Sequence, residues 1–180
     1  MNKSLALILI IGVWFRIQAF LYSTFAFTYD VGRDMLAVSN MFETYKPLLI
    51  GATTGMHGIF YGPTWYYLIS PFFLLSGGSP RGIALVMALS GALTIFVCYL
   101  IGRNIGGEKL GLIAALLVCV SQVLTEISAQ IWNPNFIPLL VATFLYLVTS
   151  KLFKKKYFPI LLGLLLGIIF DLEIVFGVLF

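Results

Sequence analysis

Charged residues are scarce in this sequence: they make up 10% of its 180 residues, whereas 61% are hydrophobic. The mean hydropathy of +1.03 lies far above the range of soluble domains, which excludes a soluble globular fold. The net charge of +4 comes from few basic residues, and most of these lie in short segments between apolar runs. Such residues orient helices and indicate no nucleic-acid partner. The composition therefore predicts a polytopic protein whose main partner is the lipid bilayer.

Cysteine is almost absent, and no cleavage signal follows the first apolar run. Cys98 and Cys119 both lie inside apolar runs, so they are interpreted as small buried hydrophobic residues, which excludes a disulfide or a metal pair. The N-terminal run lacks a site of small residues for a signal peptidase and contains Arg16. It is therefore predicted to be a retained membrane helix.

Long apolar runs dominate what the sequence does contain. The fold class predicted is all-α, with five membrane spans at residues 4–23, 82–102, 110–131, 136–150 and 158–180. A sixth apolar segment, residues 60–76, contains Pro63 and Pro71 and would reach only about 25 Å as a helix, short of a hydrocarbon core of roughly 30 Å. Its aromatic residues favour a helix at the membrane surface, partly inserted but not crossing.

The basic residues decide between the two topologies. If residues 60–76 do not cross, seven basic residues lie on the cytoplasmic side and three outside; if they cross, the numbers become two and eight. The seven are Lys3, Arg103, Lys109, Lys151, Lys154, Lys155 and Lys156, and the three are Arg33, Lys46 and Arg81. The sequence therefore predicts a multi-pass protein of the cell membrane with a cytoplasmic N-terminus. Residues 28–80 then form an outer loop, on the same face as the short loop at 126–135.

The polar stretch at residues 28–63 stands out between these apolar runs. It holds three of the seven acidic residues and the only histidine. Thr28 is a candidate N-cap, and apolar residues recur after it at helical spacing, which predicts an amphipathic helix over residues 29–45. Asp30 and Asp34 are four residues apart and so share one face of this helix. A polar segment enclosed by membrane helices is the natural place for chemistry.

Three short motifs follow one another in the predicted outer loops. They are Tyr29-Asp30, Gly62-Pro63-Thr64-Trp65-Tyr66-Tyr67 and Trp132-Asn133-Pro134-Asn135. In this order and topology, the chain resembles the N-terminal half of glycosyltransferase-C superfamily enzymes, in particular the protein O-mannosyltransferase and aminoarabinose-transferase-like group. The resemblance covers essentially all of residues 1–180 as a single transmembrane domain. Members of this group have more spans, so the chain is expected to be the N-terminal part of a longer enzyme.

The resemblance implies sugar transfer from a polyprenyl-phosphate donor to an acceptor on the outer face. An acceptor hydroxyl must lose a proton as it attacks the anomeric carbon, which makes Asp30 the candidate general base. Asp34 would orient the acceptor or share a divalent metal ion with Asp30. Where the group carries further acids, this chain has Val31 and Asn135, which weighs against a metal held between the two loops. The sequence leaves both alternatives, a metal ion or no cofactor, open.

Further polar residues of the outer face are candidates for binding the substrate, because the leaving phosphate needs cations or hydrogen-bond donors. They are Arg33, His57, Arg81, Glu126 and Asn135. Each has a plainer alternative. Arg33 can simply pair with Asp30, three residues before it, and His57 can be a loop residue with no partner. Arg81 can serve as an anchor at the membrane interface. Glu126 can mark a helix end, and Asn135 a turn.

Two other functions compete with sugar transfer. A transporter or flippase is favoured by Arg16, Asp171 and Glu173, which lie inside apolar runs where charges commonly mark a pathway. Against it, most polar residues fall in an outer loop and no inverted repeat is visible. A non-catalytic remnant is the second competitor. The sequence leaves open the sugar, the acceptor and the oligomeric state.

Overall fold

The computed structural model describes residues 2–54 and 56–174, and within these ranges the fold is all-helical, with one isolated bridge between Thr53 and Phe60. Of the span predicted at 158–180, residues 175–180 lie outside the described residues. The helices are α1 (Lys3–Tyr22), α2 (Tyr29–Thr44), α3 (Thr64–Leu75), α4 (Pro80–Val120), α5 (Gln122–Ala129), η1 (Asn133–Phe136), α6 (Ile137–Thr149), η2 (Lys151–Lys154) and α7 (Phe158–Leu172).

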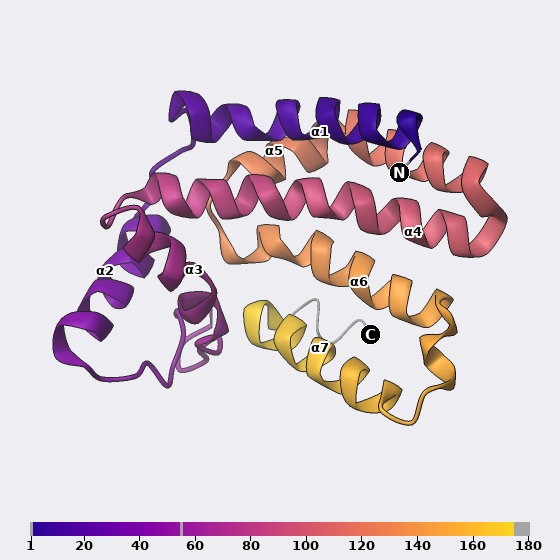
Figure 1. The fold of residues 1–180 in the computed structure, drawn as a ribbon. Helices are drawn as coiled ribbons and strands as arrows, with labels where there is room; N and C mark the ends of the chain where they lie inside the picture. Colours follow the sequence, from indigo (N-terminus) through magenta and orange to yellow (C-terminus); the bar gives the residue numbers. More distant parts are fainter. Residues whose placement is uncertain (1, 55, 175–180) are drawn as a thin grey trace.

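Helices α1 and α4 are long and apolar enough to cross a membrane. Helix α4 is two helices in sequence, because Gly106 and Gly107 interrupt it with non-helical backbone and Gly107 has a φ of 79°. A positive φ is easily adopted only by glycine, so the chain reverses direction here. The two arms of α4 then run side by side along α1 (Figure 1). The sequence correctly separated these arms as the runs 82–102 and 110–131.

The predicted run at 110–131 is nevertheless wrong as one continuous helix. Helix α4 ends at Val120, and Ser121 has extended backbone and accepts a hydrogen bond from the amide of Leu124. Ser121 therefore caps α5, as serine commonly does at a helix start. Helix α7 is also shorter than predicted, since Glu173 has extended backbone with φ −156° and ψ 104°. Both outer helix ends thus break where the sequence predicted continuous spans.

The connecting segments gather at two ends of the helix bundle. The N-terminus, the reversal in α4 and the η2 segment lie at one end, and α2 and α3 lie at the other (Figure 1). At the first end, Asn2 Nδ2 donates to Glu108 Oε1 at 2.9 Å and the Tyr99 hydroxyl donates to Glu108 Oε2 at 2.7 Å. The segments that carry Arg103, Lys109 and the lysines of η2 therefore lie at the same end as the N-terminal residues of α1.

Arg16, on α1, is buried, with 1% of its surface exposed. Its Nη1 donates to the carbonyls of Gly12 and Cys119, at 3.2 and 3.4 Å, and its Nη2 donates to the carbonyl of Val118 at 2.8 Å. The last carbonyls of a helix lack partners within the helix. Arg16 therefore satisfies the free end of α4, which accounts for this charge within an apolar helix.

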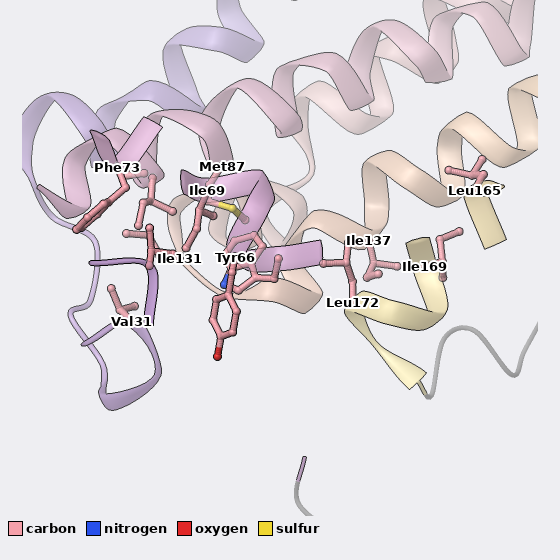
Figure 2. Close-up of a cluster of buried hydrophobic side chains, with 14 residues drawn as sticks. Val31, Tyr66, Ile69, Phe73, Met87, Ile131, Ile137, Leu165, Ile169 and Leu172 are labelled. Carbon is pink, nitrogen blue, oxygen red and sulfur yellow. The ribbon is translucent and has the colours of Figure 1, made fainter. Parts of the chain in front are cut away.

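Two clusters of buried apolar side chains hold the elements together. The smaller packs α1 against both arms of α4 through Leu5, Ile95, Tyr99, Ala115 and Cys119. Both cysteines are free; Cys119 is buried, as the sequence predicted, whereas Cys98 is only partly buried. The larger cluster joins the surface helices α2 and α3 to α4, α6 and α7 (Figure 2). This larger cluster fixes the position of α2 and α3, and with them the polar residues of the outer loop.

Candidate active site

The first two turns of α2 carry the central group of charges. The Thr28 side chain accepts a hydrogen bond from the amide of Val31, which confirms the predicted cap. Arg33 lies between the two carboxylates: its Nη1 is 2.7 Å from Asp30 Oδ1, and its Nε and Nη2 are 2.9 and 2.8 Å from Asp34 Oδ1. Arg33 therefore pairs with both acids; the sequence predicted the pair with Asp30 but not the one with Asp34.

The two carboxylates differ sharply in exposure. The Asp30 side chain is 43% exposed, whereas that of Asp34 is 5% exposed. Asp34 belongs to the buried face of α2, together with Val31 and Val38, and its Oδ2 accepts a hydrogen bond from Trp65 Nε1 on α3 at 2.8 Å. The shared helical face that the sequence predicted thus holds one accessible acid and one buried acid.

Burial also changes the acid–base properties of this group. Desolvation raises the pKa of the Asp34 carboxyl, against the opposing effects of Arg33 and Trp65. Burial alone would lower the pKa of Arg33, but its hydrogen bond to Asp34 and the charges of Asp34 and Asp30 outweigh this and raise it. Burial and the charge of Asp34 raise the pKa of Tyr66, whose hydroxyl points away from the apolar cluster (Figure 2).

Asp30 lines a cleft built by the two loops that the sequence predicted to lie on the outer face. Its walls come from the segment before α2 and from the segment that follows α5, and its volume is about 230 Å³. The lining residues are Ala26, Thr28, Asp30, Gln130, Ile131 and Trp132. Oδ1 of Asp30 is held by Arg33, and Oδ2 has no hydrogen-bond partner among the residues that the structure describes. Asp30 is therefore an anchored carboxylate that a substrate in the cleft can reach.

The start of α3 is held by residues from the end of α7. The amide of Thr64 donates to Asp171 Oδ2 at 2.9 Å, and the amide of Gly62 donates to the Asp171 carbonyl at 3.0 Å. The Tyr61 hydroxyl donates to both Glu173 carboxylate oxygens, at 3.0 and 3.2 Å. The two acids that the sequence placed inside an apolar run are thus hydrogen-bonded to residues 61–64, just before and at the start of α3.

The remaining candidates lie apart from the Asp30 cleft. His57 is exposed in the turn between Thr53 and Phe60, and Glu126 is exposed and accepts a hydrogen bond from Gln122. Arg81 is exposed, with its guanidinium carbon 5.5 Å from the centre of the Phe20 ring.

The two asparagines of η1, Asn133 and Asn135, have different surroundings. Asn135 lines a small cavity beside Arg16 and donates to the Gln130 carbonyl. Asn133 is buried and donates to the Leu172 carbonyl at 2.6 Å. Of the predicted site residues, the structure brings together only Asp30, Arg33 and Asp34.

The geometry does not fit a metal ion at this group. In the described ranges, no three side chains of His, Cys, Asp or Glu are grouped to hold one. Both oxygens of Asp34 already accept hydrogen bonds, and Arg33 places a cation between the two carboxylates. A divalent ion shared by Asp30 and Asp34 would have to displace this guanidinium.

Several residues of the site were not among the sequence candidates. Trp65 holds Asp34, Tyr61 holds Glu173, and Gln130 and Trp132 line the cleft with Asp30. Trp65 and Trp132 do stand in the motifs quoted above, so an aromatic with a polar edge in an outer-loop motif was the available signal. Nothing in the local pattern distinguishes Gln130.

Residues 61–179 match the model of a protein family described as dolichyl-phosphate-mannose-protein mannosyltransferase. The matched segment begins just before α3 and includes the cleft residues Gln130 and Trp132 as well as Asp171; α1 and α2 precede it. No curated protein and no solved structure matches the chain.

Proposed function

From the premise that this chain belongs to the dolichyl-phosphate-mannose-protein mannosyltransferase family, whose members are membrane glycosyltransferases, we propose that it transfers a sugar from a polyprenyl-phosphate donor to an acceptor outside the membrane. The family description supports the lipid-phosphate donor, since it names one. The apolar surface of the helices supports it too, because a long lipid carrier reaches its enzyme within the bilayer.

One observation carries this proposal: Asp30 stands half-exposed in a cleft between the two outer loops, with one oxygen fixed by Arg33. The acceptor hydroxyl gives its proton to Asp30 while its oxygen bonds to the anomeric carbon. The bond from that carbon to the phosphate oxygen breaks, and the lipid phosphate leaves with the electron pair. Arg33 holds the base in position, and the buried Asp34 and Trp65 hold Arg33. Positioning of this kind is what makes a weak base effective.

The test is Asp30→Asn, which keeps the size and hydrogen bonding of the side chain but cannot accept the proton. Turnover should fall by about 10²–10⁴-fold, the usual contribution of a positioned general base. Binding of the donor should change little, because the base acts on the acceptor. The measurement is transfer of radiolabelled sugar from a polyprenyl-phosphate donor into acceptor, in membranes with equal amounts of each variant.

Glu43→Gln is the matched control. Glu43 lies on the same helix, is exposed, and accepts only a hydrogen bond from Ser39 four residues earlier. This variant should transfer sugar at the normal rate. Normal turnover by Asp30→Asn would remove the assignment of the base, and absence of transfer by the unmodified protein would remove the proposed function itself.

Transport is less well supported by the same geometry. The charges that favoured it are Arg16, Asp171 and Glu173, and each has hydrogen-bond partners that hold a helix end or a loop. Asp171 and Glu173 need no pathway to explain them, and Arg16 is bonded through both of its terminal nitrogens, although its buried Nε has no partner among the described residues. The family membership also favours the enzyme.

A further inference from the structure

Three consecutive residues at the end of α7 bind the outer loops. Asp171 accepts from the amide of Thr64 through its side chain and from the amide of Gly62 through its carbonyl. The Leu172 carbonyl accepts from Asn133, and the Glu173 carboxylate accepts from Tyr61. The partners are more than 100 residues away in the case of Asp171 and Glu173, with sequence separations of 107 and 112.

Helix α3 needs this help at its first turn. The first amides of any helix have no partner within the helix, and a side-chain oxygen just before the helix usually satisfies one of them. The residue at that place is Pro63, and it makes no capping hydrogen bond. The carboxylate of Asp171 takes over the cap, and its negative charge is favourable at a helix N-terminus.

The same first turn of α3 leads directly to the site. Trp65 follows Thr64, and its Nε1 donates to the buried Asp34 at 2.8 Å. Asp34 binds Arg33, and Arg33 binds Asp30 in the cleft. Asp171 is therefore joined to the proposed base by a series of hydrogen bonds, with the neighbouring residues Thr64 and Trp65 of α3 as the covalent link between them.

We propose that Asp171 is a positioning residue: by capping α3 it sets the place of Trp65, and through Asp34 and Arg33 it sets the place of Asp30. The proposal rests on the proposed function. It assigns a role in catalysis to an acid in the last apolar run, which makes no direct contact with the cleft. The plainer reading is that Asp171 stabilises the fold and has no influence on the site.

Two substitutions separate the cap from the charge. Asp171→Asn keeps an oxygen that can accept from the Thr64 amide, whereas Asp171→Ala removes it. Glu43→Ala is the control for loss of an acid, because Glu43 is exposed at the far end of α2. The first measurement is hydrogen–deuterium exchange of the amides in the first turn of α3, on the whole protein in detergent micelles. Asp171→Ala should speed this exchange by about fivefold, the equivalent of a lost cap of about 1 kcal/mol, and Asp171→Asn should not.

The second measurement is sugar transfer per folded molecule. Asp171→Ala should lower kcat by about 10- to 100-fold without a matching rise in the KM of the donor, since a misplaced base slows the chemistry. Asp171→Asn should restore most of the rate, and Glu43→Ala should leave it unchanged. The double variant Asp171→Ala/Trp65→Phe should be no slower than the slower single variant, because both act through the same series of contacts.

The outcomes separate the two proposals. Unchanged exchange in α3, or faster exchange with a normal kcat, overturns the positioning role, and so does a double variant whose losses multiply. Exchange is read without any activity. A protein that shows the exchange effect but transfers no sugar in its unmodified form therefore overturns the proposed function and not the capping of α3 by Asp171.

Discussion

Asp34 is the residue whose surroundings say most about the site. It is a carboxylate in the buried face of an amphipathic helix, and both of its oxygens accept hydrogen bonds. A buried acid without partners would be strongly destabilising, and Arg33 and Trp65 supply what water would otherwise give. Asp34 thus positions Arg33, and the more exposed Asp30 is the carboxylate that a substrate can reach.

The raised pKa of Asp34 predicts how the stability of the protein depends on pH. Its pKa in the folded protein is raised above the ordinary value of 3.8, mainly by desolvation, so the folded state binds this proton more tightly than the unfolded chain does. Its contribution to the free energy of unfolding is therefore fully present below the ordinary pKa. That contribution is lost as the pH rises through the raised pKa. Asp34→Asn removes the titrating group and keeps an acceptor for Trp65.

The measurement is thermal unfolding of both proteins in detergent across a pH series that starts near the ordinary pKa of aspartate. The Tm of the wild type should fall relative to that of Asp34→Asn as the pH rises from about 4. The ion pair with Arg33 forms only when Asp34 is ionised, so its effect is already part of the pKa shift, and the slope of the Tm difference with pH is the quantity to compare. A difference that stays constant, or one of the opposite slope, would show that burial does not control this carboxyl.

At the scale of elements, α3 depends on other parts of the chain. It has 12 residues, too few for a stable isolated helix. The packing of Trp65 and Ile69 in the larger apolar cluster holds its buried face, and Asp171 caps its first turn. Gly62, just before α3, lies against the Asp171 carboxylate so closely that a Cβ at this position would overlap Oδ1. A larger residue at position 62 would therefore force the Asp171 carboxylate to move.

Two glycine substitutions test this junction. Gly62→Ala should displace the Asp171 carboxylate, and we expect a loss of about 1–3 kcal/mol of stability from overpacking together with a lower rate of transfer. Gly163→Ala in α7 is the matched change, because a Cβ there meets no atom within 4 Å. It should keep activity and leave stability equal or higher by up to about 1 kcal/mol, since alanine favours the helix. The measurements are thermal unfolding and sugar transfer by both variants. Equal effects of the two changes would refute the close contact between Gly62 and Asp171.

At the scale of the whole molecule, several basic segments lie together at one end of the helix bundle. The basic segments around Arg103, Lys109 and η2 share one end of the bundle, and α2 and α3 form the other (Figure 1). Helix α3 joins α2 to α4 at this second end without running along the bundle. By length and composition, only α1 and α4 are candidate membrane spans among the described helices, so the five spans and the outer position of residues 60–76 stay predictions.

Cysteine labelling tests that topology. In a background without Cys98 and Cys119, single cysteines at Lys46, before α3, and at Ser79, after it, should both react with a membrane-impermeant thiol reagent added from outside. A cysteine at Lys109, in the turn of α4, should react only after the membrane is opened. Labelling of position 46 from outside and of position 79 only from the cytoplasmic side would mean that residues 60–76 cross, and would reverse every later loop.

The sequence alone determined the features that depend on neighbouring residues. Hydropathy predicted an all-helical membrane protein, the Thr28 cap and the apolar spacing predicted α2 within one residue of its observed bounds, and the basic turns marked the loops of one face. Caps, periodicity and charge act over a few residues, and therefore they can be read locally.

Tertiary structure alone decided which polar groups meet. The spacing of Asp30 and Asp34 placed them on one face, but only the packing of Trp65 over α2 makes Asp34 the buried acid and Asp30 the accessible one. Likewise, the sequence offered Asp171 only as one of the charges in apolar runs that favour transport, whereas in the structure its carboxylate caps the start of α3. The cost of taking a charge out of water depends on the partner that lies across from it, and the partner of the partly buried Asp171 is more than 100 residues away along the chain.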